Sequence, residues 1–450
     1  VALMKIPSGA SLLHIDWLAG NVPAGETVAV DGQVLGLAAA RALESALSAR
    51  GVKLRTDLDL PGEVWPERPM LPHPPLYAHE PPQPPLARPA KLAALREAMR
   101  AHGAQWHLIS TLDDLAYLLN LRGSDVSYNP VFVAHALVGL GEARLFIDED
   151  KVPGALRTAL AADGVGLAPY AEAAASGAAL PAESALLLDP RRITLGLRQA
   201  VPSGVKVVEA VNPSTFAKSR KTEAETAWIR ATMEQDGAAL AEFFADLEQR
   251  LARRERITEL DIDERITAAR ARRAGFISPS FSTIAGFNAN GAMPHYRATV
   301  EAHAVIEGDG LLLIDSGGQY LGGTTDITRV VPIGSPSAGQ QRDFTLVLKA
   351  MMALSRARFP RGIKSPLLDA IARAPLWAEG LDYGHGTGHG VGYFLNVHEG
   401  PQVISYHAAP EPHTAMEPGM VTSIEPGLYR AGRWGIRIAN LAMNQPAPGT

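Results

Sequence analysis

Two aspartates lie on either side of a glycine-rich turn in the run Leu311–Val331, LLLIDSGGQYLGGTTDITRVV. Asp315 ends an apolar, strand-like segment, and Asp326 lies on a returning strand rich in β-branched residues. Carboxylates that face each other across paired strands repel, and a bound cation is the usual way to relieve that repulsion. The run therefore suggests a metal site, although a glycine-rich hairpin with solvated acids has the same pattern.

Three histidines, His385, His389 and His398, lie close together in the run Tyr383–Pro401, YGHGTGHGVGYFLNVHEGP. Alternate glycines let the backbone pass close to a ligand and leave the imidazoles unobstructed, which suits a metal ion or an oxyanion. The spacing matches neither G-x-G-x-x-G nor a phosphate-binding loop that ends in Gly-Lys-Ser/Thr. Histidines in a flexible turn are the alternative interpretation.

Glu425 ends a strand-like run just before a Pro-Gly turn, and Trp434–Met443, WGIRIANLAM, alternates as a strand does. Arg437 and Ala439 fall on one face of that strand, and the isoleucines beside them fall on the other. An arginine there could hold a carboxylate, although surface arginines without that task are commoner.

Together the candidate ligands form a mostly oxygen donor set with one imidazole: Asp315, Asp326, His389 and Glu425. The divalent ions Mn²⁺, Co²⁺ and Zn²⁺ suit such a set. Two ions close together would deprotonate a water for attack on a carbonyl, so the indicated chemistry is hydrolysis. No G-x-S-x-G motif competes, and the absence of cysteine excludes disulfides, thiolate metal sites and a cysteine nucleophile.

Helices and strands that would position these residues follow from periodicity and capping signals. Capping boxes beginning at Thr222 and Thr258 open two amphipathic helices, and helices over about 340–358 and 365–377 again precede strand-like segments. The repeated order hints at an internal duplication.

The fold class we expect is a multidomain protein of α+β and α/β type. Residues 61–89 hold eleven of the 34 prolines and read as an extended connector. Residues 1–88 would form a partial α/β domain that ends in this connector, and residues 89–211 a second α/β domain. Residues 212–450 would form a catalytic domain that we expect to be C-terminally truncated.

The overall charge and hydropathy exclude two classes of partner. Lysine plus arginine number 42 and aspartate plus glutamate 47, so the formal charge of −5 argues against nucleic acid. The most apolar run, which begins at Pro130, is about half the ~20 residues of a membrane span, so we expect no membrane partner.

At these residues the chain resembles the Xaa-Pro aminopeptidases, or aminopeptidases P, which are creatinase-like metallopeptidases with the pita-bread fold. The resemblance rests on the stretches NLRGSDVSYNPVF, NGAMPHY, LIDSGGQYLGGTTDITR, HGTGHGVGYFLNVHEGP, and EPGLY followed by GIRI. It implies creatinase N-terminal-like domains before a pita-bread catalytic domain, and two Mn²⁺ ions, with Zn²⁺ or Co²⁺ as substitutes. It also implies peptide substrates with proline in the second position, a cytoplasmic location and a homodimer.

The resemblance further assigns a metal role to four residues. Asp315 would serve one ion, Asp326 would bridge both ions, and His389 with Glu425 would complete the other. A water or hydroxide between the ions would be the nucleophile.

Other roles that the resemblance implies concern the substrate. His295, His385 and His398 would line the substrate site, orient the peptide and stabilise the developing oxyanion. Glu425 would double as a proton acceptor, and Arg437 would support the site from behind the ligands.

One residue departs from the pattern of the family that the chain resembles. Two positions after the arginine of GIR the family has a glutamate that bridges both metals, and this chain has Ala439. A methyl group cannot coordinate a cation, so one ion would keep only Asp315 and Asp326. Asn440 points to the opposite strand face and is a poor substitute. We therefore expect weakened metal binding and little or no turnover.

Two other functions remain as alternatives: a non-catalytic pita-bread protein that binds peptides or partners, and a prolidase-like dipeptidase. The retained ligands and site histidines favour an enzyme over a long-adapted binder, and LRGSDV favours aminopeptidase P over a prolidase. Glu411 and Glu417 lie near in sequence and are candidates to replace the missing glutamate.

Overall fold

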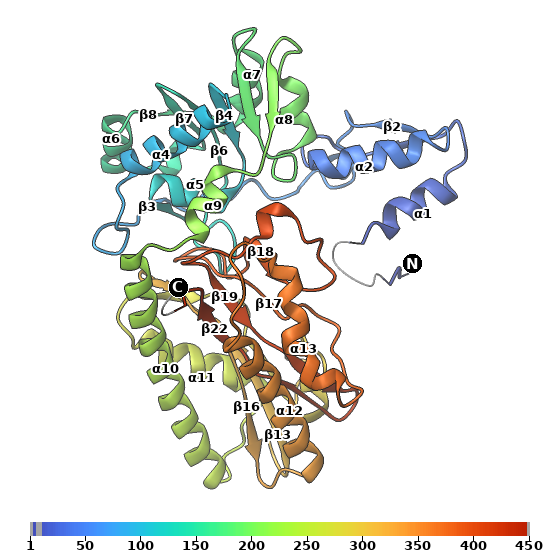
Figure 1. Ribbon diagram of the computed structural model, residues 1–450, viewed down its shortest axis with the longest axis vertical. Coiled ribbons are helices and arrows are strands. Elements are labelled where there is room, and N and C mark those ends of the chain that lie inside the picture. The colour runs from blue at the N-terminus through green and yellow to red at the C-terminus, as the bar shows by residue number, and fades with distance from the viewer. Residues whose placement is uncertain (1–2, 6–10, 448–450) are drawn as a thin grey trace. The chain divides into compact units, whose positions relative to one another are not determined.

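The structure is a computed structural model that describes residues 3–5 and 11–447, and it divides into two compact units (Figure 1). The N-terminal unit comprises Val1–Ala78, Leu86–Asp125 and Val131–Ser214. The C-terminal unit comprises His79–Pro85, Val126–Pro130 and Thr215–Thr450. The division into three domains stays a prediction.

The N-terminal unit is built on a mixed six-stranded sheet with the order β10-β9-β4-β6-β7-β8. Its strands are β4 (Trp106–Ile109), β6 (His135–Gly139), β7 (Ala143–Phe146), β8 (Val165–Ala168), β9 (Ala185–Leu188) and β10 (Lys206–Glu209). The accompanying helices are α4 (Arg88–Ala101), α5 (Leu112–Leu119), α6 (Gly154–Ala162), α7 (Ala173–Ala178) and α8 (Leu195–Ala200). Every residue of β9 is buried, as expected of a strand that is covered on both faces.

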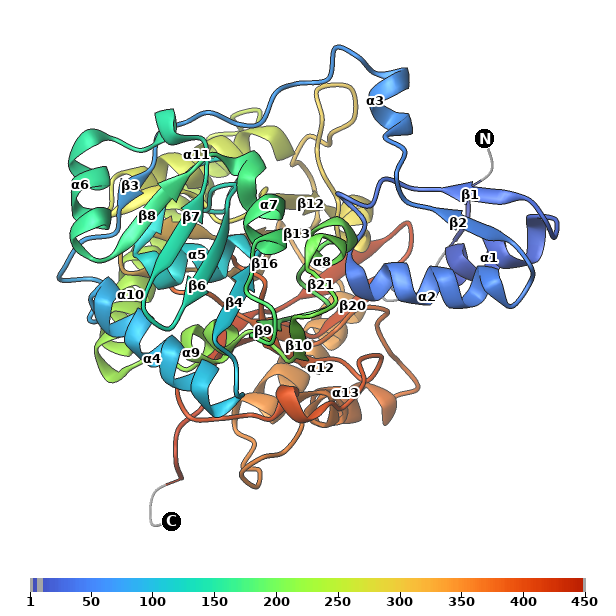
Figure 2. The ribbon, with the colours of Figure 1, turned by 90° about the horizontal axis from the view of Figure 1, so that it is seen from above.

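Two helices packed on a two-stranded sheet precede the six-stranded sheet in the chain. The helices α1 (Leu13–Asn21) and α2 (Leu37–Ser48) pack with the parallel strands β1 (Thr27–Ala29) and β2 (Lys53–Arg55) (Figure 2). The proline-rich segment then contains only α3 (Leu60–Val64) and β3 (Tyr77–Ala78), which pairs with β5 (Leu121–Arg122), before α4 begins. Its role as a connector between two domains stays a prediction.

The C-terminal unit contains two pairs of helices, each followed by strands. After α9 (Pro213–Ser219) come α10 (Glu223–Ala252) and α11 (Glu259–Ala271), and later α12 (Ala338–Ser355) and α13 (Asp369–Trp377). Both predicted capping boxes form: the Thr222 hydroxyl accepts from the Glu225 amide, and Thr258 does the same for Asp261.

The strands of this unit form small antiparallel sheets in the orders β12-β13-β16, β18-β17-β19-β22, β11-β14-β15 and β20-β21. Those of the first half are β11 (Phe276–Pro279), β12 (Ile284–Phe287), β13 (Gly310–Ser316), β14 (Gly318–Tyr320), β15 (Gly323–Thr324) and β16 (Ile327–Ile333). Those of the second half are β17 (Gly388–Gly390), β18 (Glu399–Ile404), β19 (Val421–Ile424), β20 (Gly427–Arg430), β21 (Trp434–Arg437) and β22 (Asn440–Met443).

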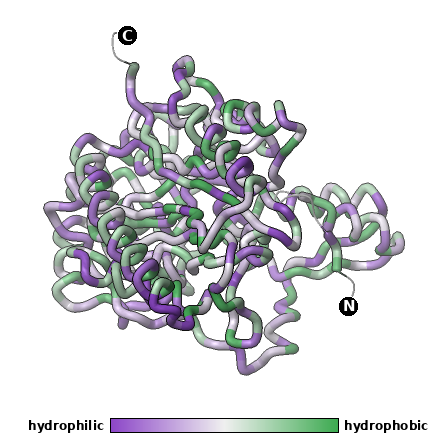
Figure 3. Tube along the Cα trace, turned by 90° about the horizontal axis from the view of Figure 1, so that it is seen from below, coloured by the Kyte–Doolittle hydropathy of each residue, from purple (hydrophilic) through white to green (hydrophobic). Residues whose placement is uncertain are grey.

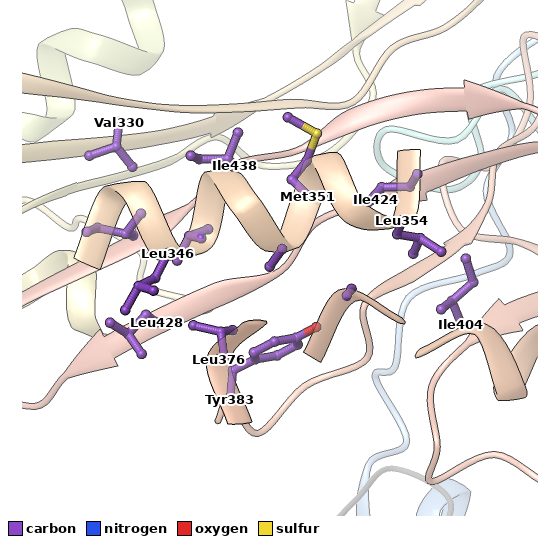
Figure 4. Close-up of a cluster of buried hydrophobic side chains, with 14 of the residues drawn as sticks. Val330, Leu346, Met351, Leu354, Leu376, Tyr383, Ile404, Ile424, Leu428 and Ile438 are labelled. Atoms are coloured by element: carbon purple, nitrogen blue, oxygen red, sulfur yellow. The ribbon is translucent and has the colours of Figure 1, made fainter. Parts of the chain in front are cut away.

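Strand β13 divides two hydrophobic cores by simple alternation. Leu311 and Leu313 pack into the core around α12 and α13, whereas Leu312 and Ile314 pack into the core under α10 and α11. Figure 4 shows the first of these cores, with Leu346 and Leu376 among its members. Side chains alternate between the faces of a strand, so an unbroken apolar run is required where both faces are covered. The two helix pairs thereby fix β13, and with it Asp315 at its end.

A buried ionic network connects both long helices to the turn before Asp326. Asp236 on α10 accepts hydrogen bonds from Arg270 Nε on α11 at 2.7 Å and from the Tyr320 hydroxyl at 2.7 Å. Its other oxygen accepts from Thr325 Oγ1 at 2.9 Å. Because Thr325 directly precedes Asp326, this network sets the direction in which Asp326 leaves the turn.

Hydrophobic and hydrophilic residues are interspersed along the trace (Figure 3). Among the described residues, no helix is long and apolar enough to cross a membrane.

His107 gives the N-terminal unit a predictable response to acid. It lies fully buried in β4, where Nδ1 contacts the Leu187 carbonyl at 3.0 Å, and burial lowers its pKa from 6.5 to about 4. Because the unfolded chain binds the proton more readily, the contribution of His107 to stability is intact above pH 6.5 and is lost as the pH falls toward 4. We expect a loss of about 3 kcal/mol from this residue.

Urea unfolding at pH 7 and pH 4 checks this expectation. His107→Asn keeps an amide donor for the Leu187 carbonyl but cannot titrate, so the variant should lose less stability on acidification than the parent. Equal losses in the two proteins would contradict the assignment.

Candidate active site

One cavity of about 460 Å³ in the C-terminal unit collects every site residue that the sequence indicated. These residues are His295, Asp315, Asp326, His385, His389, His398, Glu425 and Arg437. They come from separate strands and loops, so only the folded chain brings them together. The remaining wall includes the apolar side chains of Phe281, Ile284, Pro294 and Val403.

His389 lies between two of the candidate ligands. Its Nε2 is 3.3 Å from Asp326 Oδ2 and 3.2 Å from Glu425 Oε1, while its Nδ1 contacts the Gly390 carbonyl at 2.9 Å. A carbonyl only accepts hydrogen bonds, so Nδ1 carries a proton and Nε2 is directed at the carboxylates. This is the usual way in which a protein orients an imidazole toward a cation.

The protonation states of this trio follow from burial and from mutual attraction. Burial alone would lower the pKa of His389, but the Asp326 and Glu425 carboxylates outweigh it and hold that pKa well above its ordinary value. Burial acts to raise the pKa of Glu425, but His389 and then Arg437 lower it to about 2. Glu425 is therefore ionised at neutral pH.

Asp315 occupies a different electrostatic environment. Arg437 donates from Nε and Nη2 to Asp315 Oδ2 at 3.1 and 2.8 Å, yet burial and the repulsion of Asp326 and Glu425 raise the pKa of Asp315 to about 6. Asp315 Oδ1 is buried and has no hydrogen-bond partner among the described residues. A buried carboxylate oxygen without a partner is costly, and a cation would satisfy it.

Tyr429 belongs to the site, although the sequence did not single it out. Its hydroxyl accepts from Arg437 Nη1 at 2.8 Å and lies 2.8 Å from His385 Nε2. His385 Nδ1 contacts the Gly386 carbonyl at 2.8 Å, so Nε2 is the accepting nitrogen and Tyr429 donates to it. The β20–β21 hairpin pairs Gly427 with Arg437, and period-two alternation from that pair was the available signal.

Ala439 lies on the same sheet face as Asp315. Thr328 pairs with Asp315 on β13 and, by an isolated bridge, with Ala439, and directly opposed residues share a face. Ala439 is only 1% exposed. In the described part of the chain the buried Thr328 hydroxyl has no hydrogen-bond partner, just as Asp315 Oδ1 has none. Two polar groups near the methyl group thus lack the acceptor or cation that would satisfy them.

No other acid replaces the missing carboxylate in the described ranges. Neither Glu411 nor Glu417 is among the residues that line the cavity, and Glu417 instead pairs with Arg220 at 2.9 Å. Asn440 accepts from Arg329 Nη2 at 2.9 Å through its side-chain oxygen. The expectation that Asn440 faces away from the site agrees with this contact.

The trio of Asp326, His389 and Glu425 fits a divalent ion in donor type and partly in spacing. Ligand atoms at about 2.1 Å from one ion lie roughly 3.0–3.4 Å apart, as the two contacts of His389 do. As the side chains stand, however, no group of three or more such residues within 3–5 and 11–447 could hold a metal ion. To bind a metal ion, Asp326, His389 and Glu425 would have to give up their direct contacts with one another and point at the ion instead.

Comparison with known proteins identifies the family. The Creatinase/Prolidase N-terminal domain matches residues 67–225, and metallopeptidase family M24 matches residues 227–443. A probable Xaa-Pro aminopeptidase P of Sordaria macrospora is 37% identical over 442 residues, which cover 95% of this chain and 72% of that protein. This chain belongs to the aminopeptidase P family of M24 metallopeptidases.

Further aminopeptidase P relatives agree. Aminopeptidase P2 of Arabidopsis thaliana is 36% identical, covering 95% of this chain and 64% of its own. The crystal structure of X-prolyl aminopeptidase from Caenorhabditis elegans, a cytosolic enzyme with a di-nuclear active site, matches with a TM-score of 0.91 and 31% identity. The match covers 98% of this chain and 72% of that one. The pita-bread domain and the creatinase-like N-terminal region expected from the resemblance are confirmed.

The role of Tyr429 can be measured without turnover. Burial lowers the pKa of His385, and the Tyr429 hydroxyl adds to this effect because it bonds to the lone pair that a proton would occupy. We expect Tyr429→Phe to raise the pKa of His385, as read by NMR titration of histidine-labelled protein. Half-exposed Tyr406 provides the control Tyr406→Phe, and an unchanged His385 pKa in Tyr429→Phe would contradict the hydrogen-bond direction.

Proposed function

We propose that this chain is a metal-dependent aminopeptidase that removes the first residue from peptides with proline in the second position, and that Ala439 lowers its metal affinity and turnover. The observation that carries the proposal is the position of His389 between Asp326 and Glu425 in a cavity that also holds Asp315. The names of the aminopeptidase P relatives support the substrate class. A cytosolic location, as in the Caenorhabditis elegans enzyme, and a homodimer belong to the same proposal.

The metal-holding residues divide into a strong and a weak set. Asp326, His389 and Glu425 would hold one ion, whereas only Asp315 and Asp326 would be left to hold a second. A divalent ion, Mn²⁺ first and Zn²⁺ or Co²⁺ as substitutes, would polarise the scissile carbonyl and acidify the attacking water. Arg437 favours the ionised form of Asp315, so it keeps that ligand available.

Proton transfer falls to Glu425. It is ionised at neutral pH and would accept a proton from the attacking water. As the carbon–nitrogen bond before proline breaks, the same proton can pass to the departing proline nitrogen. Removal of Glu425 would therefore take away both a ligand and the acceptor.

Three histidines would contact the substrate. Burial lowers the pKa of His385 and of His398, and the charge of His389 lowers that of His398 further, so both are neutral at pH 7. A neutral His398 imidazole can donate one hydrogen bond to a developing oxyanion without repelling the cationic amino terminus of a peptide. Both ring nitrogens of His385 are already bonded, to the Gly386 carbonyl and the Tyr429 hydroxyl, so His385 would instead shape the wall of the substrate site. His295 lines the same cavity and completes the set.

Ala439 also favours the second candidate function, a pita-bread protein that binds peptides without cleaving them. The other predicted ligands are present, and Asp315 Oδ1 and Thr328 Oγ1, on the sheet face that Ala439 shares, are unsatisfied. Restoring that carboxylate separates the two functions.

Ala439→Glu should raise Mn²⁺ stoichiometry from at most one to two ions per chain. It should also increase release of the first residue from a peptide with proline second by about 100-fold or more, since supporting residues of metal sites alone contribute 10–100-fold. Metal content after dialysis and a cleavage assay measure the two effects. Ala439→Gln, which matches the size without the charge, is the control.

Two results would contradict this expectation. No gain in either quantity for Ala439→Glu would show that residue 439 does not limit the site. Two ions and brisk turnover in the parent would show that the methyl group is tolerated.

A further inference from the structure

The loop that carries His385 and His389 has little intrinsic rigidity. It reads GHGTGHG over residues 384–390, so a glycine alternates with every other residue. Glycine loses more backbone freedom on folding than any other residue, so such a loop holds two imidazoles in place only if something outside it restrains it. Strand β17, which carries His389, is restrained by its pairing with β18 and β19. The residues before it are restrained by one face of the short helix α13.

Arg373 on α13 holds the beginning of the loop by its backbone. Its Nη1 donates to the Tyr383 carbonyl at 2.7 Å, and its Nη2 donates to the His385 carbonyl at 2.6 Å. The guanidinium lies 3.9 Å from the centre of the Tyr383 ring and 4.5 Å from that of Tyr406. The residue is completely buried, so these bonds act in a medium of low dielectric constant, where they are directional and strong.

Asp369, one helical turn before Arg373, holds the middle of the loop. Its Oδ1 accepts a hydrogen bond from the Thr387 hydroxyl, and its Oδ2 lies 2.9 Å from Arg373 Nε. Thr387 in turn accepts at its carbonyl from the Glu425 amide at 2.8 Å. The position of Thr387 thus affects the positions of His385, His389 and Glu425.

We propose that Asp369 and Arg373 are positioning residues that set the directions of His385, His389 and Glu425 through the loop backbone and Thr387. The proposal rests on the proposed function, in which those three side chains act on a peptide. A contribution to stability does not by itself explain the pairing of Asp369 with Arg373, because a buried ion pair is often no more stabilising than apolar residues of the same size. The hydrogen bonds that Asp369 and Arg373 make reach Tyr383, His385 and Thr387, beside the site.

Thr387 offers the gentlest test. Thr387→Val removes the hydroxyl at nearly constant shape, and Thr387→Ser keeps it. Arg373→Lys keeps the charge but loses the planar fork that reaches two carbonyls. Arg342→Met, which removes an exposed pair with Glu379 on the surface, is the matched control for losing an ion pair.

The first readout needs no activity. NMR of histidine-labelled protein, with His385 assigned through His385→Asn, reports which ring nitrogen carries the proton. The parent, Thr387→Ser and Arg342→Met should show one neutral form with the proton on Nδ1. Thr387→Val and Arg373→Lys should show a mixture of the two neutral forms.

The second readout is kinetic and uses the Ala439→Glu background with Mn²⁺. A misplacement of about 1 Å can cost about 100-fold in rate, so Thr387→Val and Arg373→Lys should lower kcat strongly with little change in KM. Thr387→Ser should restore the parental kcat. A tautomer and kcat in Thr387→Val equal to those in Thr387→Ser would overturn the proposal.

Thermal stability separates positioning from folding. If kcat in Thr387→Val and Arg373→Lys recovers fully at a temperature where each is folded, the pair is structural only and the proposal fails. If the Ala439→Glu background cleaves nothing, the proposed function fails, and the NMR comparison still decides the role of Asp369 and Arg373.

Discussion

The site depends on the concentration of negative charge in a place that water reaches poorly. Asp315, Asp326 and Glu425 converge on one cavity, and the cations beside them are His389 and Arg437. The outcome is uneven: Glu425, which shares His389, has a pKa of about 2, whereas Asp315 has a pKa of about 6 despite Arg437. The positive charges of His389 and Arg437 do not offset the three carboxylates fully. A divalent cation is the simplest addition that would stabilise all three carboxylates.

The segments that carry the site share one method of support, a buried carboxylate beneath a loop. Asp236 holds the turn before Asp326 through the Thr325 hydroxyl at 2.9 Å. Glu259, at the start of α11, accepts from the Tyr296 hydroxyl at 2.8 Å and from the Ala304 amide at 2.7 Å, and so holds the loop of His295. Such groups are costly to bury and stable only when fully hydrogen-bonded, which restricts each loop to one conformation. Polar contacts thus position the side chains of the site, while the two apolar cores on either side of β13 supply the stability of the fold.

Local signals predicted most of the elements and the composition of the site, because capping boxes and alternation act over a few residues. The boxes at Thr222 and Thr258 and the paired strands β13 and β16 are of this kind, although Asp326 lies just before β16 and not on the strand as predicted. Long-range pairing was beyond such reasoning: nothing local links Asp236 to Arg270, 34 residues away, or Tyr429 to His385, 44 residues away. Hydropathy also leaves the ends of strands undefined: the apolar run from Pro130 becomes strand only at His135. The grouping of eight site residues in one cavity supports the family resemblance, which carried information that periodicity alone lacks.

Ala439 shows how stability and metal affinity oppose each other in this fold. A glutamate there would add a fourth carboxylate to Asp315, Asp326 and Glu425, and without metal its repulsion would have to be borne by the same Arg437 and His389. The methyl group removes that repulsion, so the metal-free site is easier to fold, although the Asp315 oxygen and the Thr328 hydroxyl remain among the buried unsatisfied groups of the described residues. Under the proposed function, affinity for cations would fall for the same reason, since the charge that strains the empty site is the charge that attracts the ion. Under the proposed function, the residue at 439 would therefore set the balance between the stability of the metal-free fold and its affinity for the metal.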